Sequence, residues 1–224
     1  MISHKYKCIF IHIPKCAGSS IETFFGVKPF RTDKPDYKNL TGWCPKRKIH
    51  LQHATARQLQ ELELVTEEEF KNYFKFTFVR NPWARAYSGY KWMCHVTNTN
   101  DTFRNYINKA GGFSFMAKNN MKSRSDHLFP QTDYFLINDT KAIDFIGSVE
   151  NFNYDFDFVR QNLNIYKEMN IHVQRTKKTY VHYSHFYSNR DKKRICKNYI
   201  KDIKYLNYKF DDKRKFFNKI MRCL

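Results

Sequence analysis

The chain has 224 residues, with 40 lysines and arginines against 21 aspartates and glutamates, and a formal net charge of +19. Its length suits one domain with a sizeable core. The charge favours a polyanionic partner such as nucleic acid, acidic lipid, acidic polysaccharide or a highly charged nucleotide, without choosing among them. Six scattered cysteines with no C-x-x-C pair argue against a disulfide framework or a zinc site.

The first 25 residues predict a strand, a polar turn and a helix. Ile9 to Ile13 form an apolar run interrupted by His12, which we interpret as a structural core histidine, and a helix is expected from about Ser20 to Phe25. Such a turn directs free backbone N–H groups and the positive end of the helix dipole at one point, where Lys15 adds a full charge. We therefore expect a phosphate-binding turn, with Ser19 or Ser20 capping the helix. Its expected anion contacts are Lys15, Cys16, Ala17, Gly18, Ser19 and Ser20.

This turn differs from a Walker A loop, in which a lysine follows the last glycine. Here Lys15 precedes Gly18, and the turn contains no G-K-[ST]. The turn therefore lacks the sequence of a triphosphate-binding loop.

A second strand, turn and helix follow farther along. A long loop is expected over 26–50, then helices over 56–64 and 67–73, the latter opened by a capping box of Thr66 and Glu69. Lys75 to Val79 predicts the second core strand, and a helix follows from Trp83 to about His95. Arg80 lies at the turn between them, and Ser88 lies about two helical turns beyond. Arginine binds phosphate bidentately and serine adds a hydroxyl, so this turn also predicts an anion site.

The remaining elements alternate in the same way. Short helices are expected near 103–107 and 113–117, and short strands over 134–137 and 142–146 around a turn at 138–139. A helix from Tyr154 to Leu163 and a long final helix capped by Asp191 complete the chain. The pattern predicts an α/β fold with a central, mainly parallel sheet flanked by helices and with its ligand at the carboxyl ends of the strands.

The two turns resemble the cofactor motifs of sulfotransferases that use 3'-phosphoadenosine 5'-phosphosulfate (PAPS), in particular carbohydrate sulfotransferases. The run H-I-P-K-C-A-G-S-S is similar to their phosphosulfate-binding loop, H-I-P-K-x-A-G-[ST]-[ST]. The run R-N-P-W-A-R-A-Y-S-G-Y resembles their 3'-phosphate motif, in which the residues matched by Arg80 and Ser88 hold that phosphate. Arg85 stays open between a structural ion pair and a ligand contact. The resemblance implies a single P-loop-like domain over 1–210, followed by a basic amphipathic tail over 211–224.

A weaker resemblance to the same family indicates further site residues. His53 matches the position of a catalytic histidine, and its intrinsic pKa suits a general base. Glu150 and Asp133 stay open as alternative bases or as groups that orient His53 or the acceptor. Gln131, Asp133 and Glu150 are expected near the substrate, and Arg175, Thr176 and Lys177 match a loop that closes over the nucleotide.

The resemblance implies in-line transfer of a sulfuryl group from PAPS to a hydroxyl of a glycan or glycolipid, with His53 and Lys15 as catalytic residues and no metal. It requires the clusters at 15–20 and 80–88 to converge in space. A P-loop kinase-like phosphotransferase and a non-catalytic polyanion-binding protein are the alternatives, and no nucleic-acid partner is expected. The tail either packs on its own domain or contacts an anionic membrane. With no signal peptide or anchor, the expected compartment is the cytoplasm, or the Golgi lumen for a trimmed eukaryotic chain.

Overall fold

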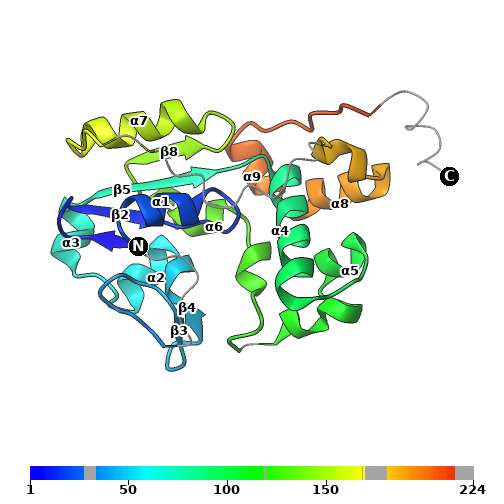
Figure 1. Cartoon of the computed structure of the whole chain (residues 1–224), viewed down its shortest axis with the longest axis horizontal. Helices are drawn as coiled ribbons and strands as arrows, with labels where there is room; N and C mark the ends of the chain where they lie inside the picture. The colour runs from blue at the N-terminus through cyan, green and yellow to red at the C-terminus, as the bar shows by residue number, and fades with distance from the viewer. Residues whose placement is uncertain (28–33, 119, 168, 170–180, 215–224) are drawn as a thin grey trace.

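Four strands form the central sheet, in the order β1 (Ile2–Ser3), β2 (Cys8–Ile11), β5 (Phe74–Val79) and β8 (Phe145–Ser148). The structure is a computed structural model that describes residues 1–27, 34–118, 120–167, 169 and 181–214. Strands β2, β5 and β8 run parallel, and β1 pairs antiparallel with β2. The predicted α/β class with a mainly parallel sheet is confirmed (Figure 1).

Helices bury the two inner strands. All of β2 and five of the six residues of β5 are buried, as expected for parallel strands covered on both faces. Phe24 of α1 and Phe156 of α7 pack edge to face with ring centroids 5.0 Å apart, and α2 contacts α6. The bounds are α1 (Gly18–Phe24), α2 (Ala56–Glu61), α3 (Glu67–Asn72), α6 (Thr132–Phe135) and α7 (Phe152–Asn162).

A second apolar core lies beside the sheet, around α4 (Pro82–Thr97). Figure 1 shows α4, α5 and α8 grouped at one end of the molecule, away from α3 and the β1–β2 turn. Tyr106, Phe113 and Tyr187 are fully buried there. The other members of this group are α5 (Phe103–Asn108), η2 (Gly111–Ala117), η4 (Tyr183–Phe186), α8 (Asn189–Asn198) and α9 (Ile200–Tyr205).

The carboxyl ends of the parallel strands meet at one edge of the sheet. The register pairs Ile11 with Thr77 and Val79 with Ser148, so the segments that follow β2, β5 and β8 leave the sheet side by side. Both predicted anion-binding turns are therefore at the edge where parallel sheets hold their ligands.

The expected strand pair over 134–137 and 142–146 is only partly correct. Tyr134 belongs to α6, and the hairpin consists of β6 (Leu136–Ile137) and β7 (Thr140–Lys141). Its turn residues Asn138 and Asp139 both have positive φ, which the tight hairpin turn requires. The following apolar segment pairs with β5 instead, because parallel pairing buries it in the central sheet. A second small hairpin, β3 (Trp43–Cys44) with β4 (Ile49–His50), lies inside the expected long loop.

The long final helix capped by Asp191 is also incorrect. Ser188 is the N-cap of α8, accepting the Asp191 N–H at 3.0 Å and donating its hydroxyl to the Asp191 carboxylate. The chain leaves helical geometry at Tyr199, whose φ is −119°, and restarts as α9. The Tyr199 hydroxyl donates to the Leu128 carbonyl, which ties this break to the segment in front of α6.

Other local expectations can be compared directly. The capping box of Thr66 and Glu69 is confirmed, and all five described cysteines are free thiols.

None of the helices in the described ranges has the length and apolar character needed to cross a bilayer. Of the predicted tail, Arg214 is buried and donates to the Tyr187 carbonyl, while residues 215–224 lie outside the described residues.

Candidate active site

The turn after β2 has an alternating backbone conformation and leads directly into α1. Lys15 and Ala17 both have positive φ, 69° and 64°, while Cys16 between them does not. Alternation of this kind is typical of anion-binding concavities. In this turn the Cys16 N–H is already bonded to the Ile13 carbonyl at 3.2 Å. Helix α1 begins at Gly18, so helical geometry leaves the N–H groups of Gly18 and Ser19 without intrahelical acceptors.

The expected serine cap is absent. The N-cap is Ala17, which has no side-chain capping bond, and Ser19 and Ser20 lie inside the first turn of α1. The helix starts earlier than the sequence indicates because Ala17, in the left-handed conformation, accepts the Ser20 and Ile21 N–H groups at 3.0 and 3.3 Å.

Gly18 is required by His12. A Cβ on Gly18 would lie 2.0 Å from the His12 ring, so the imidazole packs directly on the backbone of the turn. His12 Nδ1 is bonded to Glu22 Oε1 at 2.8 Å, and both side chains are buried. This arrangement matches the structural role expected of His12.

The two predicted turns converge. The Arg80 guanidinium donates to the Lys15 carbonyl at 3.4 Å. Helix α4 passes beside Lys15, whose Cγ would lie 3.9 Å from a Cβ on Gly89, the residue after the half-buried Ser88. Lys15 Nζ lies 5.3 Å from the Trp92 ring centroid. The turns that contain Lys15 and Arg80 therefore meet in space, as the resemblance requires.

Gln131 joins the two turns from inside the protein. Its Oε1 accepts the Arg80 N–H at 2.8 Å and the Cys16 thiol at 3.4 Å, and its amide nitrogen donates to the Arg80 carbonyl at 2.8 Å. Gln131 is fully buried. The expectation that it contacts substrate is wrong, because every polar atom of its amide group is directed at the two turns.

Cys16 is likewise part of the interior. Cys16 is 1% exposed, its N–H donates to the Ile13 carbonyl, and burial raises the pKa of its thiol to about 12. Neither its side chain nor its N–H is directed at an anion, so we correct its assignment as a cofactor contact.

Arg85 supports the backbone around the site. It is 2% exposed and donates to the carbonyls of Pro14, Phe129 and His127 at 3.1, 2.8 and 3.3 Å. The sequence left Arg85 open between an ion pair and a ligand contact. The structure assigns it three backbone carbonyls, and these bonds fix the turn after β2 against the segment before α6.

The electrostatics of Lys15 suit an anion site. Burial, with a smaller contribution from the Arg80 charge, lowers the pKa of Lys15 to about 8. A positive group held partly out of water with a second cation beside it lacks a compensating negative charge. A bound phosphate group would supply that charge.

His53 has a carboxylate partner that the sequence did not reveal. His53 ends η1 (Leu51–His53), and its Nδ1 is hydrogen-bonded to Asp126 Oδ2 of η3 (Ser125–Leu128). An ionised carboxylate only accepts, so Nδ1 carries the proton and Nε2 is the basic nitrogen. Burial lowers the pKa of His53, and Asp126 offsets part of that effect. Burial opposes ionisation of Asp126, yet the His53 charge holds its pKa well below the usual value.

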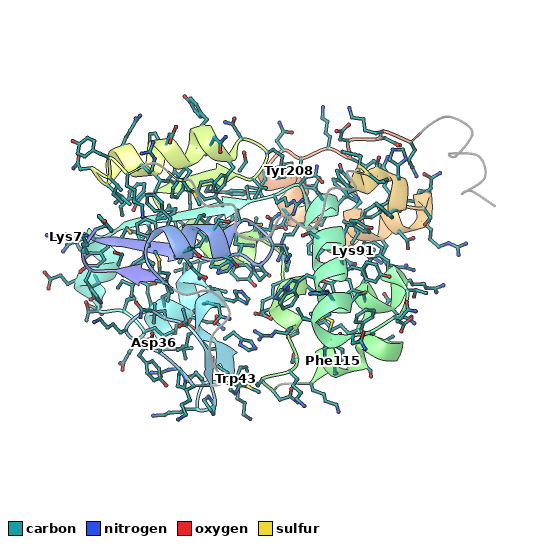
Figure 2. The ribbon with its side chains drawn as sticks, viewed as in Figure 1. Lys7, Asp36, Trp43, Lys91, Phe115 and Tyr208 are labelled. Carbon is teal, nitrogen blue, oxygen red and sulfur yellow. The ribbon has the colours of Figure 1, made fainter. Side chains whose placement is uncertain are left out.

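The carboxylates named from the sequence lie elsewhere. Glu150 accepts the Asn81 N–H at 2.8 Å and the Tyr208 hydroxyl at 3.0 Å, so both of its oxygens support the turn after β5. Tyr208 lies close to this end of the sheet (Figure 2). Asp133 is exposed on α6, where its charge interacts with Lys201. Neither orients His53 in the structure, and that position belongs to Asp126.

Rings connect His53 to the phosphate-binding turn. The centroid of His53 lies 4.9 Å from that of His12, which packs on Gly18, and 5.4 Å from that of His127. His127 stacks on Trp92 at 4.5 Å, beside Lys15. The predicted base and the predicted anion site are therefore parts of one continuous site. Arg175, Thr176 and Lys177 lie outside the described residues.

Comparison with known proteins agrees with this geometry. A family model described as the sulfotransferase family matches residues 1–209, a range that contains both turns, His53 and Asp126. No curated protein and no solved structure matches the chain significantly. Since the family match covers almost the entire sequence, the chain belongs to the sulfotransferase family and is an enzyme that transfers sulfuryl groups.

Proposed function

We propose that this sulfotransferase uses PAPS as its donor and a carbohydrate hydroxyl as its acceptor. The observation that carries the donor assignment is the 3.4 Å contact between Arg80 and the Lys15 carbonyl. It brings together two turns whose sequences resemble the two phosphate-binding motifs of PAPS-dependent enzymes. A donor with phosphate groups at both the 5' and 3' positions suits two adjacent cationic turns.

Each turn takes one end of the donor. Lys15 and the N–H groups at the start of α1 bind the 5'-phosphosulfate, assisted by Ser19 and Ser20. Arg80 and Ser88 bind the 3'-phosphate, and Arg175, Thr176 and Lys177 are further nucleotide contacts on the ground of the sequence resemblance alone.

Transfer is an in-line displacement at sulfur. The acceptor oxygen forms a bond to sulfur as the bond between sulfur and the bridging phosphate oxygen breaks, and its electron pair leaves with adenosine 3',5'-bisphosphate. His53 Nε2 takes the acceptor proton, and Asp126 stabilises the resulting imidazolium. Lys15 stabilises the charge that develops on the departing phosphate.

The acceptor class comes from the resemblance to carbohydrate sulfotransferases. The net charge of +19 supports attraction of an acidic glycan or glycolipid through long-range electrostatics. Asp133, which is exposed on α6, stays available as an acceptor contact.

The donor assignment is tested by nucleotide binding. Adenosine 3',5'-bisphosphate should bind more tightly than adenosine 5'-phosphate, and Arg80→Ala should remove about 10–100-fold of that preference, the range expected for a lost charge-assisted pair. Arg104→Ala, an exposed arginine on α5, is the matched control. Calorimetry with both nucleotides measures the ratio, and transfer of labelled sulfate from PAPS to a panel of polysaccharides and glycolipids identifies the acceptor.

Other results would reject this donor. Stabilisation by ATP with Mg²⁺, and not by adenosine 3',5'-bisphosphate, would indicate a phosphotransferase. Heparin binding that is unaffected by Lys15→Ala or Arg80→Ala, without any nucleotide affinity, would indicate a polyanion-binding protein.

Nucleotide affinity should also depend on pH through Lys15. Because the pKa of Lys15 is lowered to about 8, the free protein loses this charge as the pH rises through that value. Binding then requires reprotonation, so the affinity for adenosine 3',5'-bisphosphate should fall by up to about tenfold per pH unit above 8. Phosphate groups titrate near pH 6, below this window. Lys15→Arg, which stays charged, should remove the dependence, and an identical slope in that variant would contradict it.

A further inference from the structure

Three side chains of metal-ligating type gather at the base site. The potential ligand atoms of His53, Asp126 and His127 all lie within 4.8 Å of one another. They come from η1 and η3, which are far apart in the sequence. The side chains of His53 and Asp126 are 8% and 15% exposed, and His127 is 6% exposed. The cluster is therefore largely enclosed.

Part of this cluster has no hydrogen-bond partner. Asp126 Oδ1 and both ring nitrogens of His127 are buried without a hydrogen bond to any of the described residues. Buried polar atoms in folded proteins are almost always paired with protein groups, water or an ion. An ionised carboxylate oxygen and the unprotonated nitrogen of an imidazole both accept, so a cation between them would satisfy both.

The neighbouring His50 does not belong to the set. Its Nδ1 faces an Arg124 nitrogen at 3.0 Å, and its Nε2 faces the Met121 carbonyl at 3.0 Å. Both ring nitrogens are therefore occupied. Three residues remain to hold an ion, with further coordination positions open.

We infer that His53, Asp126 and His127 form a binding site for a zinc-type divalent cation, and that this cation, when bound, withdraws His53 from its role as the base.

Two imidazole nitrogens and one carboxylate oxygen match the donors that zinc prefers, whereas Mg²⁺ and Ca²⁺ prefer oxygen alone. Zinc bonds of about 2.0–2.1 Å in a tetrahedral site put ligand atoms roughly 3.3 Å apart, so the side chains must close in from their present separation. The positive charges of Lys15 and Arg124 act on this cluster and oppose the binding of a metal cation. We therefore expect reversible binding, weaker than that of a structural zinc site.

The effect on activity rests on the proposed function. A zinc ion bound to Nε2 of His53 occupies the nitrogen that would otherwise take the acceptor proton. A zinc ion bound to Nδ1 replaces the hydrogen bond to Asp126. Zinc should therefore inhibit sulfuryl transfer, and a chelator should restore it.

Zinc binding is tested without nucleotide or acceptor, by calorimetric titration of the untagged, metal-free full chain with zinc chloride. The wild type should bind one zinc ion at this site, and Mg²⁺ should give no saturable heat. Asp126→Asn, which keeps the shape of the side chain, and His127→Asn should each weaken binding by at least about tenfold. His95→Asn removes an exposed histidine of α4 and should bind like the wild type.

Circular dichroism and the melting temperature show whether each variant is folded. If His127→Asn fails to fold after losing its stack on Trp92, Asp126→Asn decides alone. Absence of saturable zinc binding by the wild type would overturn the inference, as would wild-type affinity in Asp126→Asn. Because the titration uses neither PAPS nor acceptor, its result is independent of whether the proposed donor and acceptor are correct.

Discussion

Replacing Lys15 by methionine should lower kcat/KM for sulfuryl transfer by about 10²–10³-fold, the usual loss when one preorganised group that stabilises transition-state charge is removed. Lys15 is the cation inside the turn that we propose to bind the donor phosphate, and the Arg80 guanidinium beside it donates to the Lys15 carbonyl at 3.4 Å. Methionine keeps the length of the side chain, and its backbone must adopt the same positive φ of 69° as that of Lys15. The loss should therefore come from the charge rather than from the fold.

Steady-state kinetics with labelled PAPS measure the effect, and an unchanged melting temperature shows that the turn is intact. Lys91→Met is the matched control, since Lys91 is an exposed lysine on the same helix that passes Lys15 (Figure 2). Near wild-type activity in Lys15→Met would remove this residue from the mechanism.

His53→Ala should lower kcat by about 10²–10⁴-fold, the range of general acid–base catalysis, while the affinity for adenosine 3',5'-bisphosphate stays close to that of the wild type. The separation is expected because the ring of His53 contacts that of His12, with centroids 4.9 Å apart, and our proposal assigns the donor phosphates to other residues. His95→Ala, in an exposed position, is the control. An unchanged kcat would exclude His53 as the base.

Asp126 should act through His53 alone. Asp126→Asn should lower kcat without changing nucleotide affinity, because an amide cannot stabilise the imidazolium as a carboxylate does. In the double variant with His53→Ala, removal of Asp126 should cause little further loss, since residues that act as a unit are not additive. A full additive loss would show that Asp126 has a separate role.

The two turns could be found in the sequence because each is a local structure. Ile9 to Ile13 is an apolar run interrupted by His12, and Lys75 to Val79 alternates, with Phe76, Phe78 and Val79 apolar. Each segment has the length of a strand and ends in a polar turn that opens a helix. Core strands are rich in apolar residues, so β2 and β5 were recognisable without knowledge of their neighbours. Residues inside these turns, such as Lys15 and Arg80, could be named for the same reason.

Residues whose partners are distant in the sequence were missed or misassigned. Asp126 is 73 positions from His53, and nothing near it distinguishes it from other acidic residues. Gln131 looked like a substrate contact, but its burial and its bonds to Arg80 depend on the packing of three segments. Adjacent to Asp126, His127 gave no signal of its own, because its contacts with Trp92 and His53 exist only after folding.

The sequence by itself determined the class of the fold and the positions of the two polar turns, since both follow from patterns within about a dozen residues. Only the tertiary structure decided which groups meet at the carboxyl edge of the sheet: Arg80 on the Lys15 carbonyl, and Asp126 on His53. Hydrogen bonds between distant segments depend on the directions of side chains after packing, and a linear pattern of residue types does not specify those directions.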